Sequence, residues 1–246
     1  MDKIKRIASL LEKLEISPQK VVLKWAQQGT IDLKQIASEL ETWRRENAFV
    51  RNWYDIRPGM YLYKNGKISH VYAENECQAV VLDVDTQNSK LLMMSLCGKV
   101  LPFSSQGYSF DTSGLLNGLN ATYLLSQMAQ DANCPVEAAQ YCLNYSDAFV
   151  DAGMAFLLTE DEAKSLSPCA EQILLALNIA HVQTNGFWLS SSSGDCSNPE
   201  KSDKKEAKVF ILHRDKVAIN REYTTVPAAV YPVFRLSSGK LSALAE

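Results

Sequence analysis

The sequence lacks long apolar runs and the compositional bias of fibrous or low-complexity chains. It has only 11 glycines and 8 prolines in 246 residues, which excludes a collagen-like chain. No stretch approaches the roughly 18 apolar residues of a membrane-spanning helix. Residues 1–18 alternate charged with apolar side chains, so they do not form the apolar core of a secretion signal. We therefore expect no membrane partner and, by default, a cytoplasmic location.

Motifs for catalysis and metal binding are also missing. The 3 histidines are scattered without zinc-ligand spacing, and the 6 cysteines form no CxxC pair. No Ser-His-Asp order, glycine-rich phosphate loop or paired-carboxylate motif is present. Without an export signal, most cysteines are expected to be free thiols. These absences favour a protein that is not an enzyme, with no catalytic residues, no metal ligands and no cofactor.

Composition places the chain among ordinary soluble globular proteins. Apolar residues make up 46% and charged residues 22%, which excludes wholesale disorder. The 25 basic and 28 acidic residues give a net charge of −3, which disfavours a general nucleic-acid binder. The length is that of one or two domains.

The pattern of the first fifty residues predicts helices. Ile4, Ile7 and Leu11 are spaced for one helical face, Ser17-Pro18 is typical of a helix start, and Asp32 begins another apolar stripe. We expect residues 1–52 to form a helical segment that packs on the next domain or makes a homo-oligomer through residues 1–50. The string TIDLKQIASEL resembles the front half of a helix-turn-helix, but the turn that should follow is absent.

From Arg57 the pattern changes to strands, turns and short helices. Asn65-Gly66 predicts a type I′ hairpin, and two apolar runs, Cys77–Val84 and Leu91–Leu96, predict buried strands. Asn120 and Asn133-Pro135 can each start a helix. Further predicted elements are a strand at 154–158, a capping box at Thr159 and Glu162, a helix opening at Ser167-Pro168, and strands at 186–190, 209–213, 216–219 and 230–236. This order predicts an α+β domain over residues 57–238.

Four strings resemble one known family. They are PGMYLYKNGKISHVY followed by CQAVVLDVD, then AAQYCLNYS with GMAFLLTEDEAKSL, then GFWLSSSSGD, and finally AAVYPVFRL. In this order they are similar to C-type-lectin-like domains typified by the C-terminal domain of a bacterial collagen-like adhesin, a fold related to variable proteins of diversity-generating retroelements. The resemblance implies an α+β fold with antiparallel sheets and two or more flanking helices, preceded here by the N-terminal helical segment. It departs from the family where Tyr231 replaces a closing Arg.

The resemblance implies non-catalytic recognition of a protein or glycan ligand by the loop-bearing edge of the domain. The polar segment 190–208, between two predicted strands, is the place to present polar groups. Trp188 fits a core position by alternation, and it also fits a surface aromatic that stacks on a sugar or partner side chain. The candidate ligand-binding residues are Trp188, Ser190, Ser191, Ser192, Asp195, Asn198, Lys204, Arg214, Arg221 and Tyr223.

Three other interpretations stay open. Calcium binding would use Asp195, Asn198, Glu200 and Asp203, although lysines are interleaved among them. Formylglycine-generating enzymes have a related fold and reactive cysteines, whereas the cysteines here have apolar neighbours. A structural or oligomerising protein with a DNA- or partner-binding N-terminal segment is the third.

Overall fold

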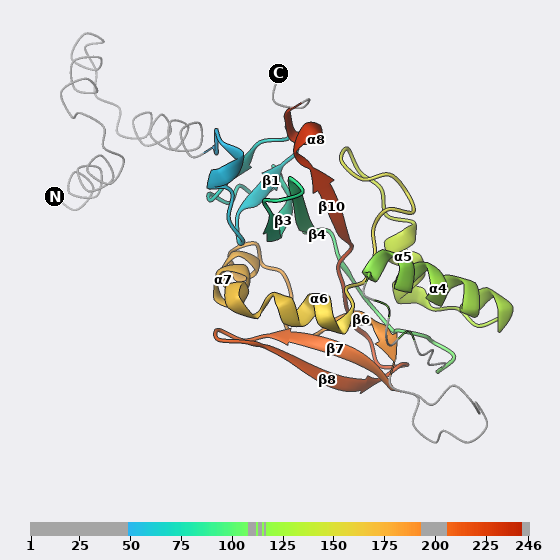
Figure 1. The fold of residues 1–246 in the computed structure, drawn as a ribbon. Coiled ribbons are helices and arrows are strands. Elements are labelled where there is room, and N and C mark those ends of the chain that lie inside the picture. Colours follow the sequence, from blue (N-terminus) through green and yellow to red (C-terminus); the bar gives the residue numbers. More distant parts are fainter. Residues whose placement is uncertain (1–48, 108–111, 113–114, 116, 193–205, 243–246) are drawn as a thin grey trace, which may run out of the picture. The chain divides into compact units, whose positions relative to one another are not determined.

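The computed structural model describes residues 49–107, 112, 115, 117–192 and 206–242. The expected helical segment 1–52 lies almost wholly outside this part, so its role and the boundary before residue 57 stay predictions. Residues 50–246 form one unit. Its described part is an α+β fold with two five-stranded sheets (Figure 1).

The first sheet is antiparallel and contains the two apolar runs. Its strand order is β10-β4-β3-β1-β2. The strands are β1 (Tyr61–Tyr63), β2 (Ile68–Ser69), β3 (Cys77–Asp85), β4 (Lys90–Ser95) and β10 (Val233–Ser237). The predictions for the two apolar runs are confirmed, since β3 and β4 pair with each other and bury most of their middle residues.

The turn between β1 and β2 differs from the predicted type I′ turn. A type I′ turn needs positive φ at both central residues. Here Gly66 has φ +79, Asn65 is not among the residues with positive φ, and the Tyr63 N–H bonds to the Lys67 carbonyl at 2.9 Å. The loop therefore has three residues and ends on a glycine in the left-handed region.

The second sheet has the order β5-β9-β6-β7-β8. Its strands are β5 (Lys99–Leu101), β6 (Phe187–Ser192), β7 (Glu206–Leu212), β8 (Val217–Tyr223) and β9 (Ala228–Val230). The β6–β9 pairing is parallel, so the expectation of purely antiparallel sheets is wrong for this sheet. The run predicted as one strand at 230–236 is divided at Tyr231-Pro232, and β9 and β10 belong to different sheets.

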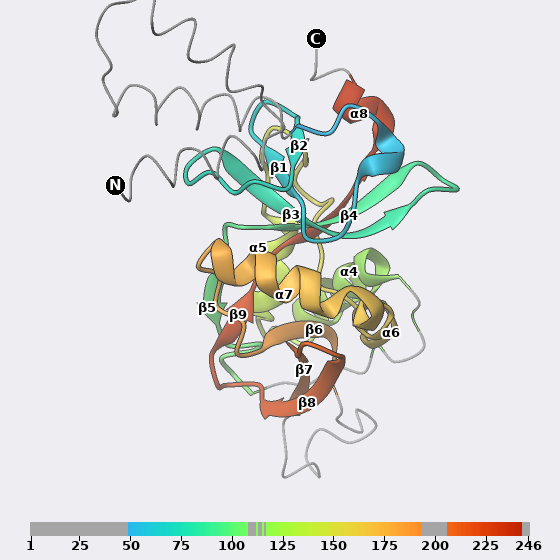
Figure 2. The same ribbon diagram turned by 90° about the vertical axis from the view of Figure 1, so that its left-hand side faces the viewer.

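Helices fill the space beside and between the sheets. They are α4 (Gly118–Asp131), α5 (Glu137–Leu143), α6 (Glu160–Ser165), α7 (Ala170–Ile179) and α8 (Ser238–Ser242), with the 3-10 helices η1 (Trp53–Asp55) and η2 (Ser167–Cys169). Helix α7 contacts β3 of the first sheet and β7 of the second, and Figure 2 shows it between them. The Tyr61 hydroxyl on β1 donates to the Ala176 carbonyl on α7 at 2.8 Å.

Two predicted details of the middle region are corrected. The residue that caps α4 is Asn117, whose side chain accepts from the Leu119 N–H, and not Asn120, which lies inside the helix. The predicted strand at 154–158 is a single bridge between Phe156 and Val233. The C-type-lectin-like assignment itself stays a prediction.

Candidate functional site

Half of the predicted ligand-binding residues lie where the structure does not describe their side chains. Asp195, Asn198 and Lys204 lie outside the described residues, as do Glu200 and Asp203 of the predicted calcium set. Ser191 and Ser192 belong to β6, but only their backbone is described. The roles of these residues stay predictions.

Trp188 and Ser190 are core residues, which corrects their place in a surface site. Trp188 is 2% exposed, its Nε1 donates to the Leu101 carbonyl at 2.8 Å, and its ring packs edge-on against Phe103. Ser190 is 0% exposed, and its hydroxyl donates to the Leu158 carbonyl at 3.2 Å. Neither side chain can reach a ligand, so the core interpretation of Trp188 holds.

The three remaining predicted residues are exposed, and Arg214 lies apart from the other two. Arg214 lies in the turn between β7 and β8, whereas Tyr223 pairs with Glu206 at the other end of the sheet. Seven-residue strands put about 20 Å between these ends. Arg221 pairs with Lys208, so the two side chains share one face of the sheet. Tyr223 is two residues further along β8 and shares this face with Arg221, so these two are neighbours and Arg214 does not join them.

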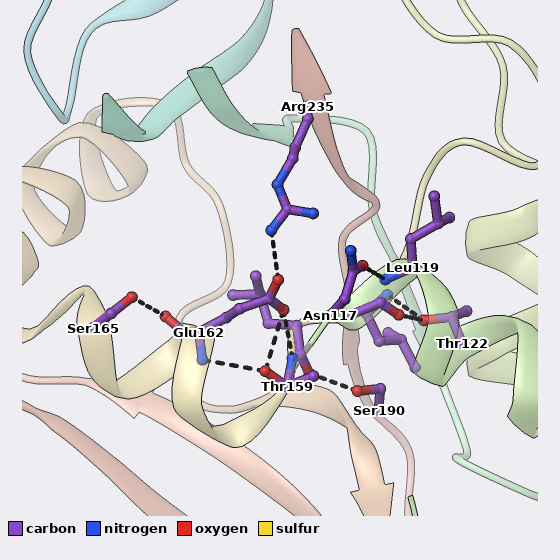
Figure 3. A network of polar contacts seen from close by, with 11 residues as sticks. Asn117, Leu119, Thr122, Thr159, Glu162, Ser165, Ser190 and Arg235 are labelled. Atoms are coloured by element: carbon purple, nitrogen blue, oxygen red, sulfur yellow. Dashed lines mark hydrogen bonds and ion pairs between the residues drawn. The ribbon is translucent and has the colours of Figure 1, made fainter. Parts of the chain in front are cut away.

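A polar network where α6 begins has a structural role (Figure 3). Thr159 and Glu162 form the predicted capping box: the Thr159 hydroxyl accepts from the Glu162 N–H at 3.2 Å, and the Glu162 carboxylate accepts from the Thr159 N–H at 2.9 Å. The other Glu162 oxygen pairs with Arg235 on β10 at 2.7 Å. Both carboxylate oxygens are thus occupied, and the network fixes α6 against the first sheet.

The second sheet also carries a pocket on the face opposite Lys208. It has a volume of about 300 Å³. Buried Val209 and Ala229 lie among its lining with half-buried Ile211 and Ala228, while Val100 and Val226 are 52% and 42% exposed. The remaining lining residues are Gln183, Asn185, Gly186, Glu222 and Pro227. The lining therefore combines aliphatic side chains with the polar side chains of Gln183, Asn185 and Glu222.

Strand alternation explains why Glu222 lines this pocket and Arg221 does not. Glu222 pairs with buried Ala207, and Arg221 pairs with Lys208, whose Nζ reaches Glu160 on α6 at 2.6 Å. Successive side chains point to opposite faces of a strand, so Arg221 lies on the α6 face and Glu222 on the pocket face. Residues 220–223, with the sequence NREY, lie in this strand, and alternation along them is the sequence signal that could have separated Glu222 from Arg221. No such pattern indicates Gln183 and Asn185, because they lie in a loop that meets Glu222 only through the order of the strands.

The polar side chains that line the pocket are two amides and one carboxylate, and none of them is basic. Gln183 and Asn185 each carry a carbonyl acceptor and an NH₂ donor, and Glu222 is an acceptor when ionised. All three are exposed, and none of the eleven lining residues is Lys, Arg or His. Such a lining suits a neutral ligand with hydroxyl groups better than an anion.

Four of the five described cysteines are buried or half-buried, and Cys97 is exposed. Cys77, Cys97, Cys134, Cys142 and Cys169 are free. Burial raises the pKa values of the Cys77, Cys142 and Cys169 thiols above their ordinary range, which disfavours the reactive thiolate. Within the part of the chain that the structure describes, no three His, Cys, Asp or Glu side chains gather to hold a metal.

No protein-family model and no curated protein matches the chain. Among solved structures, the chain is similar to a fimbrial protein from Bacteroides ovatus, with 14% sequence identity and a TM-score of 0.45. The similarity covers 74% of this chain and 49% of that protein, so the chain spans about half of its length. A likeness this distant says nothing about function. Among the described helices, none is long and apolar enough to span a membrane.

Proposed function

We propose that the protein is a non-catalytic binding module that takes a saccharide in the pocket of the second sheet. The observation that carries this proposal is the pocket itself, about 300 Å³ in volume and lined by aliphatic side chains together with Gln183, Asn185 and Glu222. This volume is at the lower end of small-molecule sites, about 300–1,000 Å³.

The chemistry of a sugar matches this lining. Its hydroxyl groups can both donate and accept, as the amides of Gln183 and Asn185 do, and they can donate to the Glu222 carboxylate. Its C–H faces can pack on Val100 and Val226, whose exposed surface water solvates poorly. A protein ligand of the lectin-like edge, the other class that the sequence suggested, has no comparable support in the described residues.

Calcium is not needed for binding at this pocket. Calcium takes 6–8 oxygen ligands in proteins, carboxylates prominent among them, and Glu222 is the one carboxylate in the lining. The C-type-lectin-like assignment and the calcium set around Asp195 remain proposals that concern other residues. A chelator is expected to leave saccharide binding at the pocket unchanged.

The cysteine-enzyme alternative is the weaker one. A thiolate nucleophile needs an electropositive, accessible setting. Cys134 and Cys142 are buried, and burial raises the pKa values of Cys77 and Cys169, which leaves Cys97 as the exposed thiol among the five described cysteines. The DNA- or partner-binding alternative for residues 1–50 stays a prediction, since those residues lie outside the described part.

A glycan array probed with the full chain tests the proposal. We expect Glu222→Ala to weaken binding to any glycan found by about tenfold or more, because a hydrogen bond to a charged group is lost. The matched control is Arg221→Ala, one residue away on the opposite face of β8, which should leave the affinity unchanged. The proposal fails if no glycan binds, or if Glu222→Ala binds as the wild type does.

A further inference from the structure

Strand β8 is the most exposed edge among the described strands. The edges of the two sheets are β2, β10, β5 and β8. β2 and β5 have two and three residues, and β10 is partly covered by its bridge to Phe156. β8 has seven residues, pairs with β7 without a bulge, and is exposed from Asn220 to Tyr223. A long, regular, uncovered edge can accept another strand.

The hairpin between β7 and β8 determines which backbone groups of β8 point away from β7. The His213 N–H bonds to the Lys216 carbonyl at 2.9 Å, so this pair is a hydrogen-bonded one. Pairs along an antiparallel ladder alternate. Residues Val217, Ile219, Arg221 and Tyr223 therefore direct their N–H and C=O groups away from β7.

At the two ends of β8, outward groups of Val217 and Tyr223 already have hydrogen-bond partners, as this alternation predicts. The Val217 N–H donates to the Ser167 hydroxyl at 3.2 Å, and the Tyr223 carbonyl accepts from the Val226 N–H at 2.9 Å. Between them, within the described residues, no hydrogen bond reaches the outward N–H and C=O of Ile219 or Arg221. These four groups form a two-rung template for an added strand.

We propose that this template pairs with the β8 strand of a second copy of the chain, antiparallel and centred on Asn220. In this register Ile219 faces Arg221 of the other copy, and Arg221 faces Ile219, so all four outward groups bond. A shift that centres the pair on Arg221 would place two guanidinium groups opposite each other, which destabilises a strand pair. A shift to Ile219 would require the Val217 N–H, which Ser167 already holds.

The side chains are compatible with the register centred on Asn220. Asn220 faces its own copy, so two amides that can both donate and accept meet at the centre. Glu222 faces Ala218, so no like charges are opposed, and the paired segment ends before Val217 and Tyr223, whose outward groups are already engaged. The two second sheets would join into one sheet across a two-fold axis, which is an isologous interface. The proposal is independent of the saccharide pocket.

Removing a single outward N–H tests the backbone contact. Arg221→Pro deletes the donor without removing a bond to β7, and proline is tolerated on an edge strand for that reason. The matched control, Arg221→Ala, keeps the N–H. By light scattering on the full chain, we expect wild type and Arg221→Ala at twice 27.4 kDa and Arg221→Pro at 27.4 kDa. A monomeric wild type, or a dimeric Arg221→Pro, would overturn the proposal.

Cross-linking tests the register and remains informative if Arg221→Pro fails to fold. The two Asn220 residues form a non-hydrogen-bonded pair, whose Cα atoms are about 4.5 Å apart, a separation that a disulfide accepts. Asn220→Cys should give a 220–220 linked dimer on oxidation, identified by mass spectrometry because native cysteines are present. Glu222→Cys lies on the same face but faces Ala218, so it should not link to itself. Equal linking of both variants, or of neither, contradicts the register.

Discussion

At the scale of single residues, Gly118 shows how a close approach can override helix propensity. It is the first residue of α4, where alanine would ordinarily be favourable. A Cβ there would lie 2.5 Å from the Leu157 carbonyl oxygen and 2.6 Å from a ring carbon of Phe156. Backbone cannot yield as the end of a flexible side chain can, so the helix or the segment beside it must shift.

We therefore predict that Gly118→Ala lowers the free energy of unfolding by about 2 kcal/mol, as overpacking does in other cores. Gly239→Ala in α8 is the matched control, because nothing lies within 4 Å of its added Cβ. Its unfolding free energy should rise by up to about 1 kcal/mol or stay unchanged. Urea denaturation of both variants measures the difference, and equal effects would contradict the packing explanation.

Residues of the site show what the sequence could and could not reveal. Alternation along 187–189 correctly allowed a core position for Trp188, and the structure buries it. Arg221 and Tyr223 are among the predicted ligand-binding residues, but neither lines the pocket. The pocket instead uses Glu222 between them, and its partners Gln183 and Asn185 lie about forty residues earlier. Their meeting depends on how β6, β8 and β9 are ordered, and no local pattern encodes that order.

At the scale of elements, the sequence predicted correctly those features that depend on residues close together in the chain. The capping box at Thr159 and the apolar runs of β3 and β4 are such cases, and all three predictions are confirmed. The parallel β6–β9 pairing and the division at Pro232 were missed. Both result from contacts between segments far apart in the chain, which periodicity does not report.

Helix α6 is joined to the second sheet by an ion pair that should make stability depend on pH. Hydrogen bonds from Lys164 and Lys208 hold the pKa of Glu160 below its ordinary value of 4.5. A carboxyl whose pKa is lower in the folded state adds stability above its unfolded pKa. That stability is lost as the pH falls through the folded pKa, because both states then bind the proton.

We therefore expect Glu160→Gln to be less stable than the wild type near neutral pH and to approach it in acid. The urea midpoint, measured from about pH 7 to about pH 3, should show the gap narrowing below the unfolded pKa. Glu171→Gln is the control, since Glu171 has no ion pair among the described residues. A gap for Glu160→Gln that stays constant over this range would show that the pair does not titrate as described.

At the scale of the whole molecule, α7 contacts both sheets, and neither of the two apolar clusters contains a residue of this helix. One cluster gathers around β1, β3, β4 and β10, and the other around Trp188 with α4 and α5. Helix α7 contacts β3 and β7, and Tyr61 bonds across to Ala176. Because neither sheet keeps its helix-covered face buried without α7, residues 50–246 should unfold as one cooperative unit.

A change confined to the first sheet tests this cooperativity. The Tyr63 hydroxyl donates to the Val71 carbonyl at 2.6 Å, near β2 and far along the chain from the second sheet. We predict that Tyr63→Phe lowers the free energy of unfolding by about 1 kcal/mol, and that hydrogen exchange reports the same loss at β3 and at β7. Tyr61→Phe, which removes the bond to α7, should affect both strands equally as well. Loss of protection at β3 alone in Tyr63→Phe would mean that the two sheets unfold independently, with α7 packed against them but not coupling them.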